Sequence, residues 1–268
     1  MRIRVVSLVA ALLATTACVP EPVTWEEDLT REMGTLNDTL RLTLADDGAP
    51  RLVGAWSPQA WPEESGVCDA TRRASRAAVA DTVYASWFQV RADSSVLLRV
   101  ARSDDGGRSW GAPVTADSMD AGRAGCSRPV PFLEVDPFNG YVQLAYHLDA
   151  REGAGLFFVH SMTQGTAFEQ PQPIVYGDRP SQAVIASRGD TVLVAYEDPN
   201  SRLPQLGLAL SRTAGHIFES RIAASDATGE ARTPRIALRG DAFVIAWTAT
   251  QRGGGASYIA FRRGTLTW

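Results

Sequence analysis

The sequence predicts an all-β protein, and more specifically a β-propeller built from four-stranded blades. Two observations carry this prediction: β-rich segments of one pattern recur about every fifty residues, and each is followed by another β-rich run that ends in a glycine-containing turn. A helical hydrophobic period is nearly absent. Four-stranded units that repeat around an axis form a propeller, which hides most of its sheet edges by closing on itself.

The repeated segment has a small-residue entry, a polar turn and a β-rich run that ends in an aromatic residue. Clear copies are 78–88, 133–147, 184–197 and 236–248, and 42–56 fits less well. Gly-Asp or Asn-Gly turns between alternating β-branched runs are typical of hairpins. The second runs are 97–110, 156–168, 206–218 and 258–268. Each copy therefore predicts one blade.

These units predict about five blades, with the first and the last unit short, and a count of four or six also fits the spacing. The last unit shows no clear outer strand. We therefore expect a strand from about Val23 to Gly34 to complete it. The propeller is assigned to residues 36–268, after a segment, 18–35, that holds the linker or lipid anchor and this closing strand.

Residues 1–17 have the features of a secretory signal. Arg2 and Arg4 precede an apolar run that is too short to span a bilayer, and small residues lead to Cys18. The small residues before the cysteine resemble a bacterial lipoprotein signal, which implies lipidation of Cys18, although Thr15 stands where such signals usually carry Leu. Ordinary cleavage after Ala17 is the alternative. Either process places the protein outside the cytoplasm, lipid-anchored in the cell envelope or secreted.

The composition excludes several classes of function. The net charge is −4, which argues against nucleic acid as a partner. All 26 basic residues are Arg, so chemistry that needs a lysine is excluded. The 45% apolar content argues against a disordered chain. The three histidines (His147, His160 and His216) are too scattered for a metal site, and we predict no metal or other cofactor.

Cys68 and Cys126 are the two cysteines left once Cys18 is assigned to a lipid. Each lies just upstream of a repeat start, so the two are able to face each other across neighbouring units. Disulfides persist outside the cytoplasm, and we expect one here. A metal site or a catalytic thiol is less favoured, because no CxxC or Cys-His spacing accompanies them.

The turn Ser103-Asp104-Asp105-Gly106-Gly107-Arg108-Ser109-Trp110 carries a specific motif, S-x-D-x-G-x-[ST]-W. Asp105 is expected to accept hydrogen bonds from its own turn, and Gly107 to supply a positive φ. Trp110 is expected to pack between neighbouring blades. The turns at 161–168 and 211–218 keep the Ser, the Gly and an aromatic residue but lack the Asp, at spacings of 58 and 50 residues.

These turns, in register with the strand repeats, resemble the sialidase-like Asp-box (BNR repeat) β-propeller superfamily over roughly residues 36–268. The resemblance implies that the box residues Ser103, Asp105, Gly107, Ser109 and Trp110 are structural and lie on the face opposite the active site. The superfamily mixes hydrolases with non-enzymatic binding proteins, so the fold does not decide the function.

Binding residues are expected on the face away from the boxes, in the loops between second and third strands and in the blade-to-blade crossings. The polar candidates there are Arg128, Arg179, Arg232, Arg235, His147 and Asp149. Several Arg side chains around one axis form a site for a carboxylate, because guanidinium groups pair bidentately with planar oxyanions. The alternative is that these Arg side chains pair with Asp178, Glu230 and their neighbours and tie the blades together.

The catalytic set of a sialidase is incomplete here. Resemblance to sialidases implies an Arg triad for the substrate carboxylate, a Tyr nucleophile paired with a Glu, and an Asp acid/base. The F-R-I-P motif that supplies the first triad Arg is missing from the sequence. Tyr196 with Glu197, Tyr258 and Asp178 are the candidates for the other roles, and none of them stands in a distinctive motif.

We therefore predict an extracytoplasmic propeller, monomeric, that binds a glycan or an envelope protein without catalysis and meets the membrane only through a lipid at Cys18. An exo-acting sialidase-type glycoside hydrolase is the alternative from the enzyme class. A third hypothesis is a structural envelope lipoprotein whose channel is filled by apolar side chains.

Overall fold

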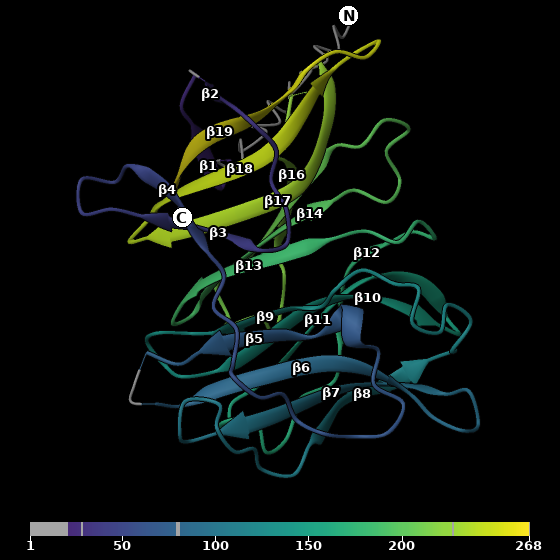
Figure 1. The fold of residues 1–268 in the computed structure, drawn as a ribbon. Helices are drawn as coiled ribbons and strands as arrows, with labels where there is room; N and C mark the ends of the chain where they lie inside the picture. Colours follow the sequence, from purple (N-terminus) through teal and green to yellow (C-terminus); the bar gives the residue numbers. More distant parts are fainter. Residues whose placement is uncertain (1–20, 28, 79–80, 227, 268) are drawn as a thin grey trace, which may run out of the picture.

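The computed structural model describes residues 21–27, 29–78, 81–226 and 228–267 (Figure 1). The all-β prediction is confirmed: this part of the chain forms nineteen strands and one short 3-10 helix, η1 (Asp69–Thr71). The signal segment 1–17 and Cys18 lie outside the described residues. No helix in the described ranges is long and apolar enough to cross a membrane.

The strands form successive antiparallel meanders along the chain. The first meander is the two-stranded sheet of β3 (Leu40–Leu44) and β4 (Pro50–Gly54). The second comprises β5 (Arg73–Arg76), β6 (Val83–Val90), β7 (Val96–Ser103) and β8 (Val114–Asp120). The third comprises β9 (Phe132–Val135), β10 (Val142–Ala150), β11 (Gly153–Ser161) and β12 (Gln172–Tyr176).

Two further meanders complete the molecule. The fourth is β13 (Ala183–Arg188), β14 (Thr191–Glu197), β15 (Leu206–Ser211) and β16 (Ser220–Ala223). The fifth is β17 (Gly229–Arg239), β18 (Ala242–Gln251) and β19 (Ser257–Leu266). The N-terminal strands β1 (Val23–Trp25) and β2 (Thr30–Met33) both pair with β19, so the expected closing strand is present as two short pieces.

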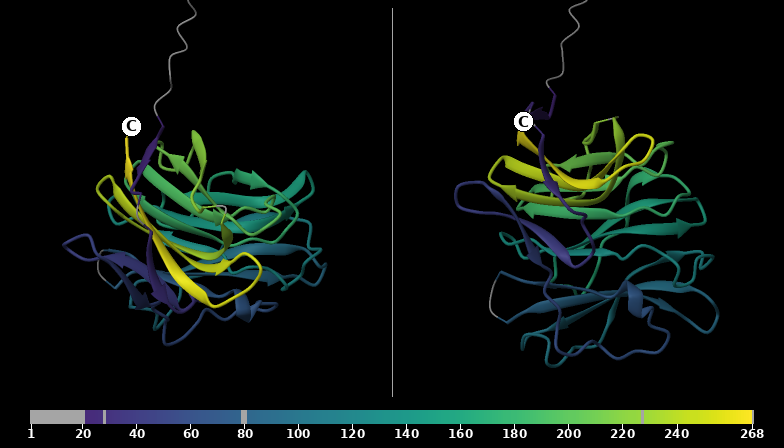
Figure 2. Two further views of the ribbon diagram at one scale, coloured as in Figure 1. Left: turned by 90° about the horizontal axis from the view of Figure 1, so that it is seen from above. Right: turned by 45° about the horizontal axis from the view of Figure 1, so that its top comes forward.

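The meanders lie around a central channel, as in a β-propeller, with the first strand of each innermost. β5 contacts β9, β9 contacts β13, β13 contacts β17 and β17 contacts β3 (Figures 1 and 2). Hydrogen bonding alone does not define a blade count, because β10 and β8 pair at one position and join two meanders into an eight-stranded sheet. The first meander has only two strands.

In the four larger meanders the second strand is buried along most of its length. Every residue of β14 between its two ends is buried, and β10 is buried along nearly its whole length. Sheets packed against neighbours on both faces favour continuous apolar runs rather than alternation. This is why the repeat in the sequence is recognised by its uninterrupted β-branched and aromatic segment.

Two faces follow from the alternating strand directions. The turns 104–113, 162–171 and 212–219 lie at the same end as the hairpin turns 136–141 and 189–190, and we call this end the box face (left in Figure 1). The loops between second and third strands and the meander-to-meander connections lie at the other end, which we call the crossing face.

The first box turn has the hydrogen bonds that its residues predict. Asp105 Oδ1 accepts from the backbone N–H groups of Arg108 and Ser109, both at 2.9 Å, and Oδ2 accepts from the Ser109 hydroxyl at 2.6 Å. Ser103 Oγ accepts from Gly107 N at 2.9 Å. Trp110 differs from expectation: its indole donates to Ala60 O at 2.9 Å and packs on the segment before β5.

Threonine takes the place of Asp105 in the other two turns. Thr163 Oγ1 accepts from Ala167 N at 3.1 Å, and Thr213 Oγ1 accepts from Ile217 N at 2.9 Å. The serines keep their role, since Ser161 and Ser211 accept from Gly165 N and Gly215 N at 2.9 and 3.1 Å. One hydroxyl therefore supplies one of the contacts that the carboxylate makes.

The box glycines also allow each meander to contact the one before it. A Cβ on Gly215 would lie 2.2 Å from the Phe158 ring of the third meander, and one on Gly165 would lie 3.0 Å from the Tyr84 ring of the second. Both glycines have positive φ, +90° and +80°. The Gly is thus required for space as well as for backbone conformation.

The predicted disulfide between Cys68 and Cys126 is present, with the two Cα atoms 5.3 Å apart. It joins the segment before β5 to the connection between the second and third meanders. A disulfide of this kind is typical of proteins outside the cytoplasm.

Replacing Gly215 by Ala is expected to destabilise the protein more than replacing Gly240 by Ala. Both residues have positive φ (+90° and +60°), but only Gly215 has an aromatic ring in the space a Cβ would fill. Backbone strain costs about 1–2 kcal/mol at either site, and overpacking adds roughly 1–3 kcal/mol at Gly215 alone. Urea unfolding of both variants measures the difference, and equal losses would contradict the role assigned to the Phe158 contact.

Candidate functional site

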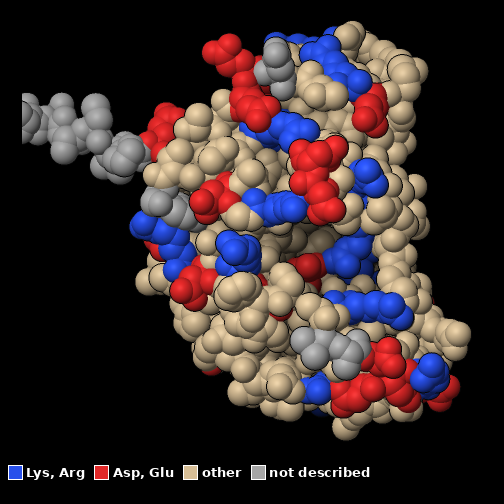
Figure 3. Space-filling model, turned by 90° about the vertical axis from the view of Figure 1, so that its left-hand side faces the viewer, with Lys and Arg blue, Asp and Glu red and all other residues tan. Residues whose placement is uncertain are grey.

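A cavity of about 460 Å³ lies in the central channel. Its walls come from the first strands β3, β5, β9, β13 and β17, together with β4. Leu44, Pro137, Ser187 and Leu238 line it where those strands reach their hairpin turns, so it opens on the box face. Figure 3 views this face and shows a hollow near its middle with blue and red side chains around it.

The crossing-face end of the same channel is filled. The Arg235 guanidinium donates to the carbonyls of Leu40 and Pro234, both at 2.6 Å, and to that of Asn37. Arg73 donates to Asp38 O at 2.7 Å. Only about 10 Å³ of space remains beside these groups. The chain before β3 is thus held across the channel and closes it on the face where the sequence predicted the binding site.

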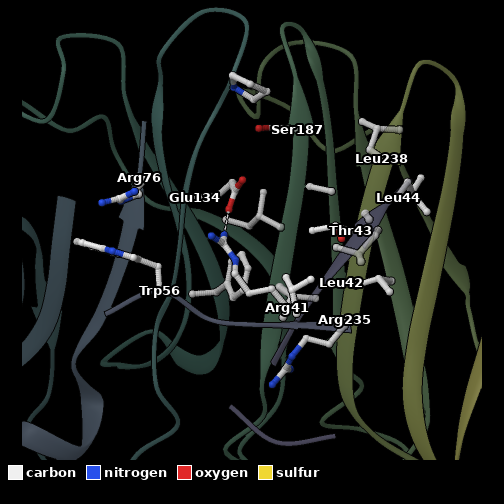
Figure 4. A pocket seen from close by; sticks show the side chains of 18 of the residues that line it. Arg41, Leu42, Thr43, Leu44, Trp56, Arg76, Glu134, Ser187, Arg235 and Leu238 are labelled. Carbon is white, nitrogen blue, oxygen red and sulfur yellow. Dashed lines mark hydrogen bonds and ion pairs between the residues drawn. The ribbon is translucent and has the colours of Figure 1, made fainter. Parts of the chain in front are cut away.

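An ion pair crosses the wall of the cavity. Arg41, from β3, donates to the Glu134 carboxylate, from β9 (Figure 4). Their side chains keep 31% and 23% exposure, so a ligand can reach both groups. Burial raises the pKa of Glu134, and the nearby Arg41 opposes this shift. The Arg41 guanidinium also lies 5.8 Å from the centroid of the Phe132 ring.

A second guanidinium at the cavity has no carboxylate partner in the described part of the chain. Arg76, at the end of β5, is exposed and stacks on Trp56 at 4.7 Å (Figure 4). Stacking on an aromatic face holds the guanidinium plane in one orientation and leaves its N–H groups free for a ligand.

Ser187 contributes a buried hydroxyl without a protein partner. The residue is 8% exposed, it lines the cavity, and its Oγ makes no hydrogen bond in the structure. A buried hydroxyl without a partner costs roughly 1–3 kcal/mol. A ligand hydroxyl or carboxylate that enters the cavity would remove this cost.

Three of the predicted crossing-face residues come together between the second and third meanders. Arg128 is 1% exposed and forms a bidentate ion pair with Asp120, which is 4% exposed. Burial, and then the charge of the nearby Arg128, lower the pKa of His147. The Nδ1 atom of the His147 ring is buried and has no hydrogen-bond partner. Asp149 pairs with Arg123 on the same side.

The other predicted arginines lie elsewhere and contact other protein groups. Arg179 donates to the carbonyls of Asp198 and Ser201, the latter at 3.0 Å, and so ties the connection before β13 to the loop after β14. Arg232 is 54% exposed and pairs with Glu230 at 3.2 Å. Together with Arg235 in the channel, these side chains occupy three separate places.

The candidate catalytic residues do not form a pair either. Tyr196 is 5% exposed, and burial raises its pKa to about 12. The neighbouring Glu197 accepts from Thr233 N at 2.7 Å. Tyr258 is half-buried with the Arg31 guanidinium 4.9 Å from its ring centroid, and Asp178 is exposed. In the described ranges, no group of three His, Cys, Asp or Glu side chains is placed to hold a metal ion.

No family model and no curated protein matches the sequence. Among solved structures, a protein of unknown function from Dyadobacter fermentans matches with a TM-score of 0.52 and 16% identity, over 69% of this chain and 50% of that one. The likeness is one of fold.

Two glycosidases also match, at lower scores. The Hadza microbial sialidase Hz136 has a TM-score of 0.45 and 13% identity, over 85% of this chain and 46% of that one. The xylan β-1,4-xylosidase from Bacillus halodurans has a TM-score of 0.47 and 10% identity, over 87% of this chain and 52% of that one. The chain spans about half the length of these solved proteins.

The channel residues Arg41, Trp56, Glu134 and Ser187 were missed by sequence reasoning. Arg41 and Trp56 stand in or beside 42–56, the copy that fits the repeat least well. Glu134 offered a signal, because it is the single carboxylate in the apolar run LEV before the Asp136 turn.

His160 gives the fold a measurable dependence on pH. It packs against His216 with ring centroids 4.6 Å apart, and its Nε2 is buried without a partner. Burial, and then the nearby His216, lower its pKa to about 4, and Glu169 opposes this shift. Between pH 6.5 and 4 the unfolded chain binds a proton at this site that the folded protein does not, so stability falls as the pH is lowered.

The free energy of unfolding is expected to fall by at most about 3 kcal/mol across this pH window because of His160. We expect His160→Phe to flatten the pH dependence of the free energy of unfolding between pH 7 and 4.5, because the ring is kept and the titration removed. Urea unfolding at four pH values gives the slope. An unchanged slope in the variant would show that other groups, such as His147, carry the dependence.

Proposed function

We propose that this protein is a non-catalytic extracytoplasmic propeller of five blades that binds a glycan in the channel cavity on the box face. The five blades correspond to the five meanders, the last completed by β1 and β2. The observation that carries the proposal is the lining of the cavity: the accessible Arg41–Glu134 pair beside aromatic rings, with the unpartnered Ser187 hydroxyl.

The chemistry of the lining suits a sugar. The charged pair supplies donors and acceptors for hydroxyl groups, and charge-assisted hydrogen bonds are the stronger ones. Trp56 and Phe132 offer apolar faces to the C–H surface of a pyranose ring. A cavity of about 460 Å³ lies within the range of small-molecule sites.

Among the described residues, the candidates for a sialidase-type catalytic set lie away from the cavity, which supports binding without turnover. Tyr196 is buried and Glu197 is engaged by a backbone N–H of the neighbouring blade, away from the cavity lining. Arg128 and Arg235 are both engaged by protein groups, namely Asp120 and backbone carbonyls, rather than by Asp178 or Glu230. The alternative function, an exo-acting sialidase-type hydrolase, requires these residues to reach one substrate.

Binding is tested on an array of oligosaccharides with the purified protein. We expect Arg41→Ala to weaken the best glycan by about tenfold or more, as loss of a charge-assisted hydrogen bond implies. Glu134→Gln keeps the shape of the pair and removes its charge, so it is expected to weaken binding as well. Arg108→Ala removes an exposed charge from the same face, outside the cavity, and is expected to bind normally.

Turnover of a fluorogenic sialoside is measured in parallel, with Arg179→Ala as a control. We expect no turnover. Turnover that the variant loses would replace the binding proposal by the hydrolase. Glycan binding that Arg41→Ala and Glu134→Gln leave unchanged would place the site outside the channel cavity.

A further inference from the structure

A second cavity of about 350 Å³ adjoins the channel cavity on the box face. Pro137 lines both cavities, and the wall of the second begins at Ala77, the residue after Arg76. The two cavities are therefore neighbours on the same face, and a long ligand can occupy both. This arrangement favours a glycan that is longer than one sugar unit.

The wall of the second cavity is polar and already ordered. The Tyr84 hydroxyl donates to Gln164 O at 3.2 Å. Arg102 donates to Asp104 Oδ1 at 2.8 Å and to the side-chain oxygen of Gln164. These contacts join the second and third meanders and hold the donors in place before any ligand arrives.

Phe138 lines this cavity with an exposed aromatic ring on a well-ordered turn. It is 75% exposed, although its backbone is tightly held: Asp136, itself 1% exposed, accepts from the N–H groups of Phe138, Asn139 and Gly189 at 2.7, 3.0 and 2.9 Å. An exposed ring on a fixed turn is a platform for the apolar face of a sugar.

Two exposed arginines on the box face stack on aromatic rings and have no carboxylate partner in the described ranges: Arg76, which lines the channel cavity, and Arg188, which lies against Phe138 at the second cavity. Arg76 lies over Trp56 at 4.7 Å, and Arg188 lies over Phe138 at 5.5 Å. Guanidinium groups held in this way bind carboxylates bidentately. Two such groups, one in the wall of the channel cavity and one on the Phe138 ring of the second, match a ligand that carries a carboxylate on successive units.

We propose that the ligand is an acidic oligosaccharide, a chain of uronic acid units, with one unit in the channel cavity beside Arg76 and the next beside Phe138 and Arg188. This inference rests on the proposed function and specifies the ligand of the same site. It assigns Phe138 and Arg188, which the channel cavity alone does not involve, to recognition of the second unit.

The test compares galacturonic acid, its α-1,4-linked trimer and the neutral maltotriose by calorimetry with the full protein. We expect the trimer to bind about tenfold tighter than the monomer or more, and maltotriose to bind more weakly than the acidic trimer. Raising the salt concentration is expected to weaken the acidic ligands only, since it screens exposed charge pairs.

Variants separate the two positions. Phe138→Ser and Arg188→Gln are expected to reduce trimer affinity to that of the monomer and to leave monomer binding unchanged. Arg76→Gln is expected to weaken both ligands. Arg108→Gln, an exposed arginine of the same face, is the control and is expected to change neither. Thermal unfolding of each variant verifies that it folds.

Equal affinity for monomer and trimer, or for maltotriose and the acidic trimer, would overturn this inference and leave glycan binding in place. The same holds if all three saccharides fail to bind while another glycan binds in an Arg41-dependent manner. If no oligosaccharide of any kind binds, the proposed function fails as well.

Discussion

The arrangement of the candidate site depends on how Arg235 and Arg73 hold the chain that precedes β3. These two side chains donate to carbonyls of residues 37–40 and fix that segment across one end of the channel. Both guanidinium groups are largely buried, and burial lowers the pKa of each. Because one end is closed in this way, the described residues leave the channel cavity open toward the box face.

Backbone carbonyls are a recurrent target of arginine in this protein. Arg179, Arg221, Arg239, Arg262 and Arg263 each donate to main-chain oxygens, most of them in another part of the chain. The planar guanidinium has five N–H donors and can bridge two loops at once, which the compact ammonium group of lysine does less well. The exclusive use of Arg therefore has a structural consequence, because each such side chain joins segments that strands alone leave unconnected.

The fold was largely predictable, because its signals are local. The second strands bury both faces and show as continuous apolar runs, and the box turns require Ser and Gly at fixed spacing. Thr163 and Thr213 were harder to recognise, since a hydroxyl that replaces one oxygen of a carboxylate leaves no distinctive spacing. The site was less predictable. Arg235 carries the same charge whether it faces a ligand or a carbonyl, and its partner lies nearly two hundred positions away in the sequence.

The pairing of β1 and β2 with β19 has a consequence for the time course of folding. Val23 lies opposite Leu266, so the final sheet joins the two ends of the described chain. Pairings this distant in sequence form slowly, because the ordering entropy of the intervening chain must be overcome first. The last sheet thus closes late in folding, once the two ends of the described chain have come together.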